Sequence, residues 1–145
     1  MTTPLTTDWG EEWYTDNNVD GATVTVGLYN DSTDAASETF DVAAVTSEPS
    51  GSAYARQSTT VSTGTSGGEY GLISDSQVSF DVSDSSQTID AAFAIVSFQS
   101  GRAGDGSATD HVIFVDGLSA TYDLSSSSSP DTININAGDL SLLSD

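Results

Sequence analysis

A single histidine, His111, is the one side chain in this sequence whose ordinary pKa lies close to neutrality. Nucleophilic or general-base chemistry at neutral pH would therefore centre on it. His111 begins an apolar segment, and no serine of a recognisable nucleophile elbow accompanies it. Serine and aspartate are so abundant here that a Ser/His/Asp match by composition carries no information. We predict that His111 is structural or exposed rather than catalytic, and we expect no enzymatic activity.

Two aspartates raise the possibility of glycoside hydrolysis, which needs a protonated carboxyl in an apolar pocket opposite a second carboxylate. Asp90 lies in the most apolar segment and Asp116 lies in a turn-like dipeptide, but nothing in the sequence brings them together. The glycine-rich residues 64–68 contain no lysine, so they do not form a phosphate-binding loop. We therefore expect no catalytic residues and no cofactor.

Clusters of acidic and amide side chains could also bind Ca²⁺, which prefers six to eight oxygen ligands. Asp16, Asn18 and Asp20 lie within one loop, but the segment only loosely resembles a calcium-binding loop and no glutamate follows at the required spacing. These three residues are weak Ca²⁺ candidates. Solvated acidic surface is the simpler interpretation, and it predicts no specific metal site.

The charge of the chain is its strongest compositional signal. The 145 residues include 22 acidic side chains, two arginines (Arg56 and Arg102) and no lysine, for a net charge of −20. Such a surface would repel itself in dilute buffer, whereas in molar salt the Debye length falls to about 3 Å. An acidic disordered segment is the alternative, but 36% of the residues are hydrophobic and follow periodic patterns. We predict a folded halophilic protein.

The same charge limits the possible partners. Nucleic acid and anionic lipid attract clusters of lysine and arginine, which are missing here, so we expect neither as a partner. No stretch approaches the ~18 apolar residues that a membrane span requires. The first residues have no basic or apolar signal-peptide region, and we expect no secretion signal.

One short helix is predicted over residues 8–18, within an N-terminal arm of residues 1–20. Asp8 is expected to cap it, with Glu11 three residues later as in a capping box. Trp9 and Trp13 are four residues apart and share one helical face. They suit packing in a core or an interface, and sugar stacking is the alternative.

Residues 21–145 are predicted to form one all-β domain, an antiparallel, jelly-roll-like β-sandwich of eight or nine short strands. The segment 89–98 is apolar on both faces and should be a central strand with both sides covered. Asp116-Gly117 predicts a tight hairpin, residues 64–68 predict a loop that leads to a strand, and the last two strands are expected to pair. The predicted strands are residues 22–29, 39–46, 54–63, 76–82, 89–98, 111–115, 118–124, 132–136 and 140–143.

Interface cores are enriched in aromatic residues and arginine. We expect Arg56 to form a bidentate pair with an acidic side chain that holds its sheet edge, and Arg102 to do the same across a subunit contact. The candidate contact residues are Trp9, Trp13, Tyr14, Tyr54, Arg56 and Arg102.

Several segments, in this order, resemble a family of small structural virion proteins of tailed bacteriophages and archaeal tailed viruses. The best match is Gly51-Ser-Ala-Tyr-Ala-Arg-Gln57, which follows a strand that ends in Leu-Tyr at Tyr29. The His111 strand with its following Gly-Leu, and a Gly-Asp turn before the final strand, match more loosely. The chain departs from the family pattern in a longer segment from Gln99 to Asp110 and in lacking an aromatic residue before His111.

This resemblance implies a non-enzymatic virion component with a β-sandwich fold. Together with the charge, it suggests a tailed virus of haloarchaea. The expected role is a capsid-surface decoration or turret protein, present as a homo-oligomer, with other virion proteins as partners. The protein would then reside in the virion, which is assembled in the host cytoplasm. Two alternatives remain: a tail or baseplate component, and a carbohydrate-binding β-sandwich that engages the host cell surface.

Overall fold

The computed structural model describes residues 4–16, 19–66, 69–99 and 107–143, and antiparallel strands dominate them. One α-helix and one short 3₁₀ helix, η1, accompany the strands. In chain order the elements are β1 (Leu5–Thr6), α1 (Asp8–Asp16), β2 (Thr23–Tyr29), η1 (Val42–Ala44), β3 (Gln57–Ser66), β4 (Glu69–Ser74), β5 (Val78–Asp81), β6 (Thr88–Phe98), β7 (Thr109–Asp123), β8 (Thr132–Ile135) and β9 (Ser141–Leu143).

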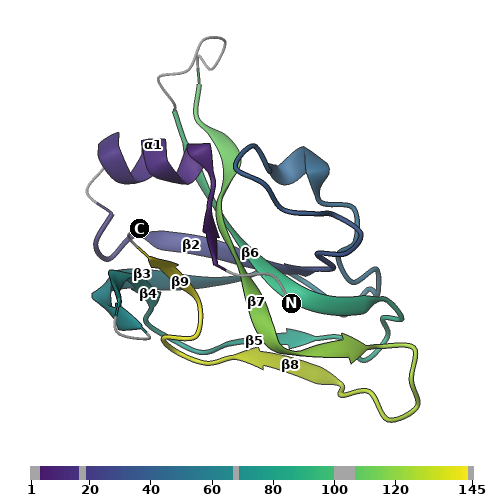
Figure 1. Cartoon of the computed structure of the whole chain (residues 1–145). Coiled ribbons are helices and arrows are strands. Elements are labelled where there is room, and N and C mark those ends of the chain that lie inside the picture. Colours follow the sequence, from purple (N-terminus) through teal and green to yellow (C-terminus); the bar gives the residue numbers. More distant parts are fainter. Residues whose placement is uncertain (1–3, 17–18, 67–68, 100–106, 144–145) are drawn as a thin grey trace.

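The strands form two layers of unequal size. Within the described residues, a curled seven-stranded sheet has the order β1-β7-β6-β2-β3-β4-β9, and a two-stranded sheet pairs β5 with β8. Figure 1 shows the β5–β8 pair lying beneath the large sheet, while α1 lies beside the opposite end of β7. The predicted all-β, sandwich-like class with one short N-terminal helix is confirmed.

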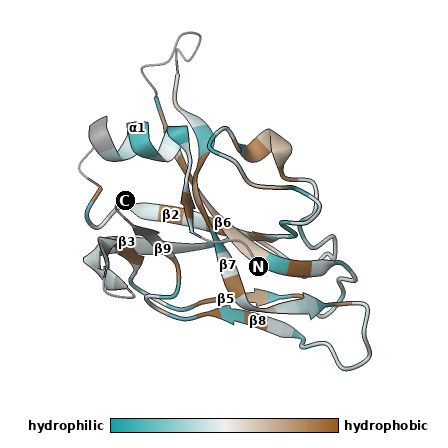
Figure 2. Ribbon diagram, in the orientation of Figure 1, coloured by the Kyte–Doolittle hydropathy of each residue, from teal (hydrophilic) through white to brown (hydrophobic). Residues whose placement is uncertain are grey.

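Strand β6 lies in the middle of the large sheet and is covered on both sides. Every residue from Ile89 to Val96 is buried, and the ribbon of β6 is largely hydrophobic where it runs beside β7 (Figure 2). Ala92, Ala94 and Val96 face the main core between the sheets. The prediction of a central strand with both faces covered is confirmed.

The other face of β6 is covered by the long connection between β2 and β3. Phe93 and Ile95 join a second apolar cluster that includes Tyr29 and Phe40. Phe40 and η1 belong to that connection, so it forms a third layer over this part of the sheet. Gly27 of β2 leaves room for the Phe93 ring, because a Cβ atom at position 27 would lie 2.4 Å from Cζ of Phe93. The molecule therefore has two cores that share β6.

Helix α1 is fixed to β7 through a threonine. Asp8 was the predicted cap, but the hydroxyl of buried Thr7 accepts the hydrogen bond from Gly10 N at 3.1 Å, so the predicted Asp8–Glu11 capping box is wrong. The Thr7 amide also donates to the Ile113 carbonyl. A Cβ on Gly10 would lie 2.0 Å from that same carbonyl oxygen, so only glycine allows the helix to pack this closely.

The predicted strand over residues 39–46 is wrong. This segment contains η1 instead, and Asp41 caps it by accepting a hydrogen bond from Val42 N at 2.8 Å. The alternation of Phe40, Val42 and Ala44 imitates a strand. Phe40 is buried in the second core, whereas Ala44 is exposed. A short polar cap thus overrides a weak period-two pattern.

The hairpin predicted at Asp116-Gly117 is also wrong, because β7 runs unbroken from Thr109 to Asp123. A tight two-residue hairpin of the Asp-Gly type requires positive φ at its central residues. Among the described residues, positive φ occurs only at Gly21 and Gly138. Gly117 instead pairs with Ala91 of β6 as an ordinary strand residue.

Two further strand predictions need correction. The segments 132–136 and 140–143 do not pair with each other, since β8 pairs with β5 and β9 pairs with β4. The predicted loop at residues 64–68 is shorter than expected, because β3 continues through Gly64 to Ser66 and β4 begins at Glu69. The register pairs Gly64 with Gly71.

Replacing Phe93 with alanine tests the second core. Phe93 is fully buried, so Phe93→Ala should lower the free energy of unfolding by about 3–5 kcal/mol, measured by chemical denaturation in molar salt. Ser79→Ala, at an exposed position of β5, is the control and should change it by less than about 0.5 kcal/mol. A loss well below 1 kcal/mol for Phe93→Ala would show that the third layer does not pack on β6 in solution.

Candidate functional site

Arg56, a predicted contact residue, forms an ion pair within the chain. Its Nε donates to Glu48 Oε1 at 2.9 Å and its Nη2 donates to Glu48 Oε2 at 2.7 Å. The guanidinium also lies over the ring of Phe93, 5.1 Å from the centroid. The hydrogen bond to Glu48 raises the pKa of Arg56 and keeps it charged. The predicted bidentate arginine–carboxylate pair is confirmed, and it fastens the β2–β3 connection to the sheet.

Tyr54 completes this junction. Its hydroxyl donates to Glu48 Oε1 at 2.9 Å and accepts from the Leu28 amide at 2.9 Å. Burial raises the pKa of the phenol, so it remains a neutral donor. The motif around Gly51–Gln57 therefore has a structural function, because Tyr54 and Arg56 converge on one carboxylate.

His111 lies in a second polar cluster, between Asp41 and Thr109. Its Nδ1 is 3.0 Å from Asp41 Oδ2, and its Nε2 is 2.7 Å from Thr109 Oγ1. The ring of Trp9 stacks on the imidazole with centroids 3.7 Å apart, and Phe98 meets it edge-on. His111 is buried. This cluster joins α1, β6, β7 and the segment before η1.

The order of carboxylate, imidazole and hydroxyl in this cluster is the order found in hydrolase triads. Three features nevertheless indicate that the cluster has a structural role. Thr109 and His111 are two residues apart on one strand, which places them on the same face by strand geometry alone. Asp41 Oδ1 is already bonded to the amides of Val42 and Val112. Trp9 covers a face of the ring. The arrangement connects β7 to its neighbours, so of the two alternatives predicted for His111, structural or exposed, the structure supports the first.

The two aspartates considered for glycoside hydrolysis have different partners. Asp90 is buried and accepts a hydrogen bond from the Asp31 amide at 2.8 Å, which ties down the turn after β2. Asp116 is buried beside the start of β9, where Ser141 and Gly117 amides bond to it and Asp139 lies near. Burial, reinforced by the charge of Asp139, raises the pKa of Asp116 to about 6.

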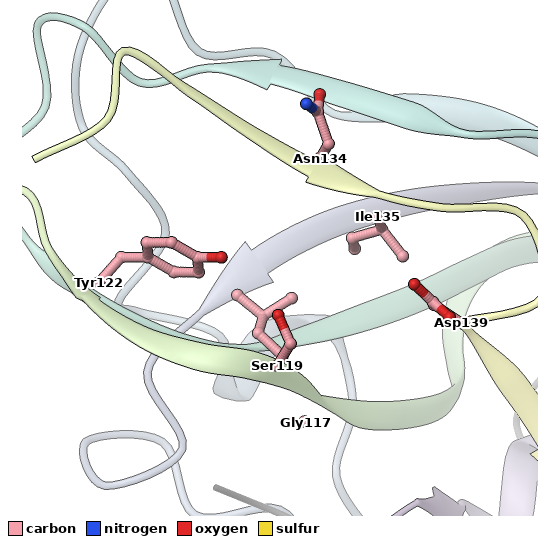
Figure 3. Close-up of a pocket in the computed structure, with 7 residues that line it drawn as sticks. Gly117, Ser119, Tyr122, Asn134, Ile135 and Asp139 are labelled. Atoms are coloured by element: carbon pink, nitrogen blue, oxygen red, sulfur yellow. The ribbon is translucent and has the colours of Figure 1, made fainter.

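A pocket of about 290 Å³ lies close to Asp116, between β7 and β8. Its walls combine apolar, hydroxyl and carboxylate groups. In Figure 3 the hydroxyls of Tyr122 and Ser119 point into the space between the strands, and the Asp139 side chain approaches it from the opposite side. The lining residues are Gly117, Leu118, Ser119, Tyr122, Asn134, Ile135 and Asp139.

An irregularity in β7 shapes this pocket. Ile89 pairs with Tyr122 and Ala91 pairs with Gly117, so β7 has four residues where β6 has one. Such bulges turn side chains out of the regular alternation. Ser119, Ala120 and Thr121 are exposed within this segment. The bulge therefore presents Ser119 and Tyr122 on the side of β8.

Of the three predicted calcium candidates, only Asp20 has a side chain within the described part of the chain. Asp20 accepts a hydrogen bond from the Thr63 amide at 2.8 Å and so joins the β2 end to β3. The Asp16 side chain and Asn18 lie outside the described residues, as does Arg102. Among the side chains that are described, no three histidine, aspartate or glutamate groups are arranged to hold a metal ion.

The helix residues predicted as contacts have three different environments. Tyr14 is 44% exposed and is available to a partner. Trp9 is partly buried against the main core and stacks on His111. Trp13 is 5% exposed and belongs to that core, so the structure assigns it to packing within the chain rather than to a surface contact.

Sequence reasoning missed the partners that give these residues their roles. Glu48 lies eight residues before one of the two arginines, and that proximity was a usable signal for their pairing. Asp41 had no such signal, because its contacts with His111 and Val112 span 70 residues or more. The grouping of Tyr122, Ser119 and Asp139 depends on a bulge that composition does not reveal.

The fold and these sites define an all-β, sandwich-like protein with a pocket of mixed polar and apolar lining between β7 and β8. No family model, curated protein or solved structure matches the chain. No helix in the described residues is long and apolar enough to span a membrane.

The raised pKa of Asp116 predicts a pH-dependent term in stability. Because the folded chain holds this proton more tightly, the stabilisation is complete below the unfolded pKa of about 3.8 and is lost as pH rises through about 6. Asp116→Asn removes the titration, so relative to wild type the variant should gain about 1–2 kcal/mol between pH 4.5 and pH 7.5, after allowance for partial solvent screening.

Denaturation of both proteins at the two pH values measures this gain. The contributions of the carboxylates that both proteins share cancel in the difference between their free energies of unfolding. Ser79→Ala, which changes no titratable group, is the control and should show no relative change with pH. An Asp116→Asn difference that is equal at both pH values would contradict the assigned environment of Asp116.

Proposed function

We propose that this chain is a non-enzymatic structural component of the virion of a halophilic tailed virus. In this proposal it decorates the capsid surface, as a decoration or turret protein, and assembles as a homo-oligomer with other virion proteins as neighbours. The sequence resemblance around Gly51–Gln57 suggests the virion, and the charge suggests the halophilic host. The structural use of Tyr54 and Arg56 supports a role for that motif in rigidity rather than catalysis.

The observation that carries the proposal is the way carboxylates hold the loops. Buried Asp34 accepts hydrogen bonds from the amides and hydroxyls of both Thr46 and Ser47, at 2.5–2.8 Å. Burial opposes ionisation of Asp34, but these four hydrogen bonds outweigh it and hold its pKa below the ordinary value. These hydrogen bonds join a residue near the start of the β2–β3 connection to two residues in its second half.

Other aspartates act in the same way on the surface. Asp84 accepts from the Ser52 hydroxyl at 2.9 Å and from the Ala53 amide. Asp75 binds the hydroxyls of Thr60 and Ser62, on the neighbouring strand. Short hydrogen bonds of this kind depend on contact rather than on long-range attraction, so salt weakens them less than it weakens exposed ion pairs. Hydrogen bonds of this kind therefore suit a rigid protein that works in concentrated salt.

The surface also bears on assembly. Tyr14 is the large hydrophobic side chain that stands exposed among the described residues, and aromatic residues are enriched at interface cores. We assign the contact between subunits, or with a neighbouring virion protein, to the face of α1 that carries Tyr14. A tail or baseplate position would use the same face.

Labelling the protein on purified particles tests this function. Gold-conjugated antibody against the chain, applied to virions from infected haloarchaeal cultures and viewed by electron microscopy, should label heads at regular spacing. Label on tails would move the protein to the attachment machinery within the same class. Particles that carry no label, from a culture in which the protein is abundant by immunoblot, would overturn the virion assignment.

A further inference from the structure

We propose that the pocket between β7 and β8 binds one ring of a neutral saccharide. This inference goes beyond the structural role proposed above and does not depend on it. A sugar ring presents an apolar face of C–H groups and an edge of hydroxyls that both donate and accept hydrogen bonds. The pocket offers groups of both kinds, because Leu118, Ile135 and the ring of Tyr122 contribute apolar lining and the side chains of Ser119 and Asp139 contribute polar lining.

The backbone of β8 adds a donor and an acceptor. Val82 N donates to the Asp131 carbonyl at 2.9 Å, which fixes the phase of the β5–β8 ladder. Bonded and non-bonded pairs alternate in antiparallel strands, so the backbone groups of Ile133 and Ile135 face β5, whereas the N–H and C=O of Asn134 face the open edge. Figure 3 shows the Asn134 side chain pointing away from the pocket, which leaves its backbone as the lining group.

The charges around the pocket select the class of sugar. Asp139 is the charged side chain in the described lining, and buried Asp116 lies close behind it. No arginine, lysine or histidine contributes to that lining. A phosphate, a sulfate, a uronic acid or a sialic acid would meet only negative charge there. Asp139 already accepts one hydrogen bond, from Asn136 Nδ2 at 3.2 Å, and a carboxylate has acceptor capacity for sugar hydroxyls beyond that.

The volume and the local backbone support a single-ring ligand. About 290 Å³ lies at the small end of the range for ligand pockets. The bulge in β7 places Ser119 and Tyr122 together at the mouth, whereas regular alternation would put residues three apart on opposite faces. Because Tyr122 packs against the main core and Leu118 is buried, the apolar wall is preformed.

Titration followed by nuclear magnetic resonance tests the proposal on the whole chain in molar KCl. The probes are glucose, galactose and N-acetylglucosamine, with glucuronate as the anionic counterpart and spermidine as a cationic one. The neutral sugars should shift the amide signals of Gly117, Ser119 and Asn134 with dissociation constants in the millimolar range, as a single small contact surface allows. Glucuronate and spermidine should bind at least about tenfold more weakly.

Two tyrosine variants distinguish this pocket from non-specific binding. Tyr122→Ala should weaken sugar binding at least about tenfold, because it removes the aromatic wall. Thr33→Ala, at an exposed position outside the pocket lining, is the control and should bind like wild type. Tyr122→Phe keeps the ring and should retain the apolar contact, which guards against a folding defect in the alanine variant.

The proposal is overturned if no neutral sugar shifts these amides at about 100 mM, or if Tyr122→Ala binds as tightly as wild type while remaining folded. Preferential binding of glucuronate or of spermidine would also overturn it, since either would show that charge rather than the sugar face selects the ligand. None of these outcomes bears on the labelling of particles, so the two proposals fail separately.

Discussion

The ion pair between Arg56 and Glu48 is the constraint on which the layered arrangement depends. It is bidentate, it lies over the ring of Phe93, and its two side chains are 31% and 23% exposed. Arg56 is the one arginine among the described residues, and the sequence contains no lysine. Arg56, a rare cation in this chain, thus connects the segment between β2 and β3 to the start of β3 and to the buried ring of Phe93.

From this junction the second core follows. The connection between β2 and β3 carries Phe40 over the outer face of β6, and that face would otherwise expose Phe93 and Ile95 to water. Asp34 closes the connection on itself through Thr46 and Ser47, and Asp41 attaches it to β7 through Val112 and His111. A long irregular segment becomes a layer partly because the carboxylates of Asp34 and Asp41 accept hydrogen bonds from amides within it and on β7.

Acidity therefore has two roles in this molecule. Exposed carboxylates give the surface its large negative charge, which concentrated cations screen. Carboxylates at turns are structural acceptors, and their hydrogen bonds replace the ion pairs that a chain with lysine would use. The pocket beside Asp116 and Asp139 is a third setting, in which negative charge excludes anions and leaves an amphipathic wall for a neutral ligand.

Sequence patterning predicted those features that depend on neighbouring residues. Local sequence patterns predicted the buried strand β6, the strand β2 and the short helix α1. The presence of Arg56 in a strongly acidic chain predicted that it has a carboxylate partner. The errors arose where distant contacts decided the outcome. Asp116-Gly117 has the composition of a hairpin, but residues 114–117 before the bulge and residues 122–123 after it all pair with β6, so β7 continues.

The site was less predictable than the fold for the same reason. Glu48, Asp41 and the pocket residues act through partners brought together by the tertiary structure, and their residue types are common throughout the chain. Residues 40–44 alternate as in a strand, but Asp41 caps a 3₁₀ helix over Val42–Ala44. The ring of Phe40 is buried in the second core. Only the arginine was rare enough for its type alone to indicate its role.

A double-mutant cycle on Glu48 and Arg56 tests the central claim most directly. The free energy of unfolding of wild type, Glu48→Ala, Arg56→Ala and the double variant would be measured in about 0.5 M and about 3 M KCl. The account predicts a coupling energy of about 1–2 kcal/mol that changes little with salt, because the pair is in contact and partly buried. A coupling near zero, or one that disappears in concentrated salt, would contradict the claim that this ion pair holds the layers together.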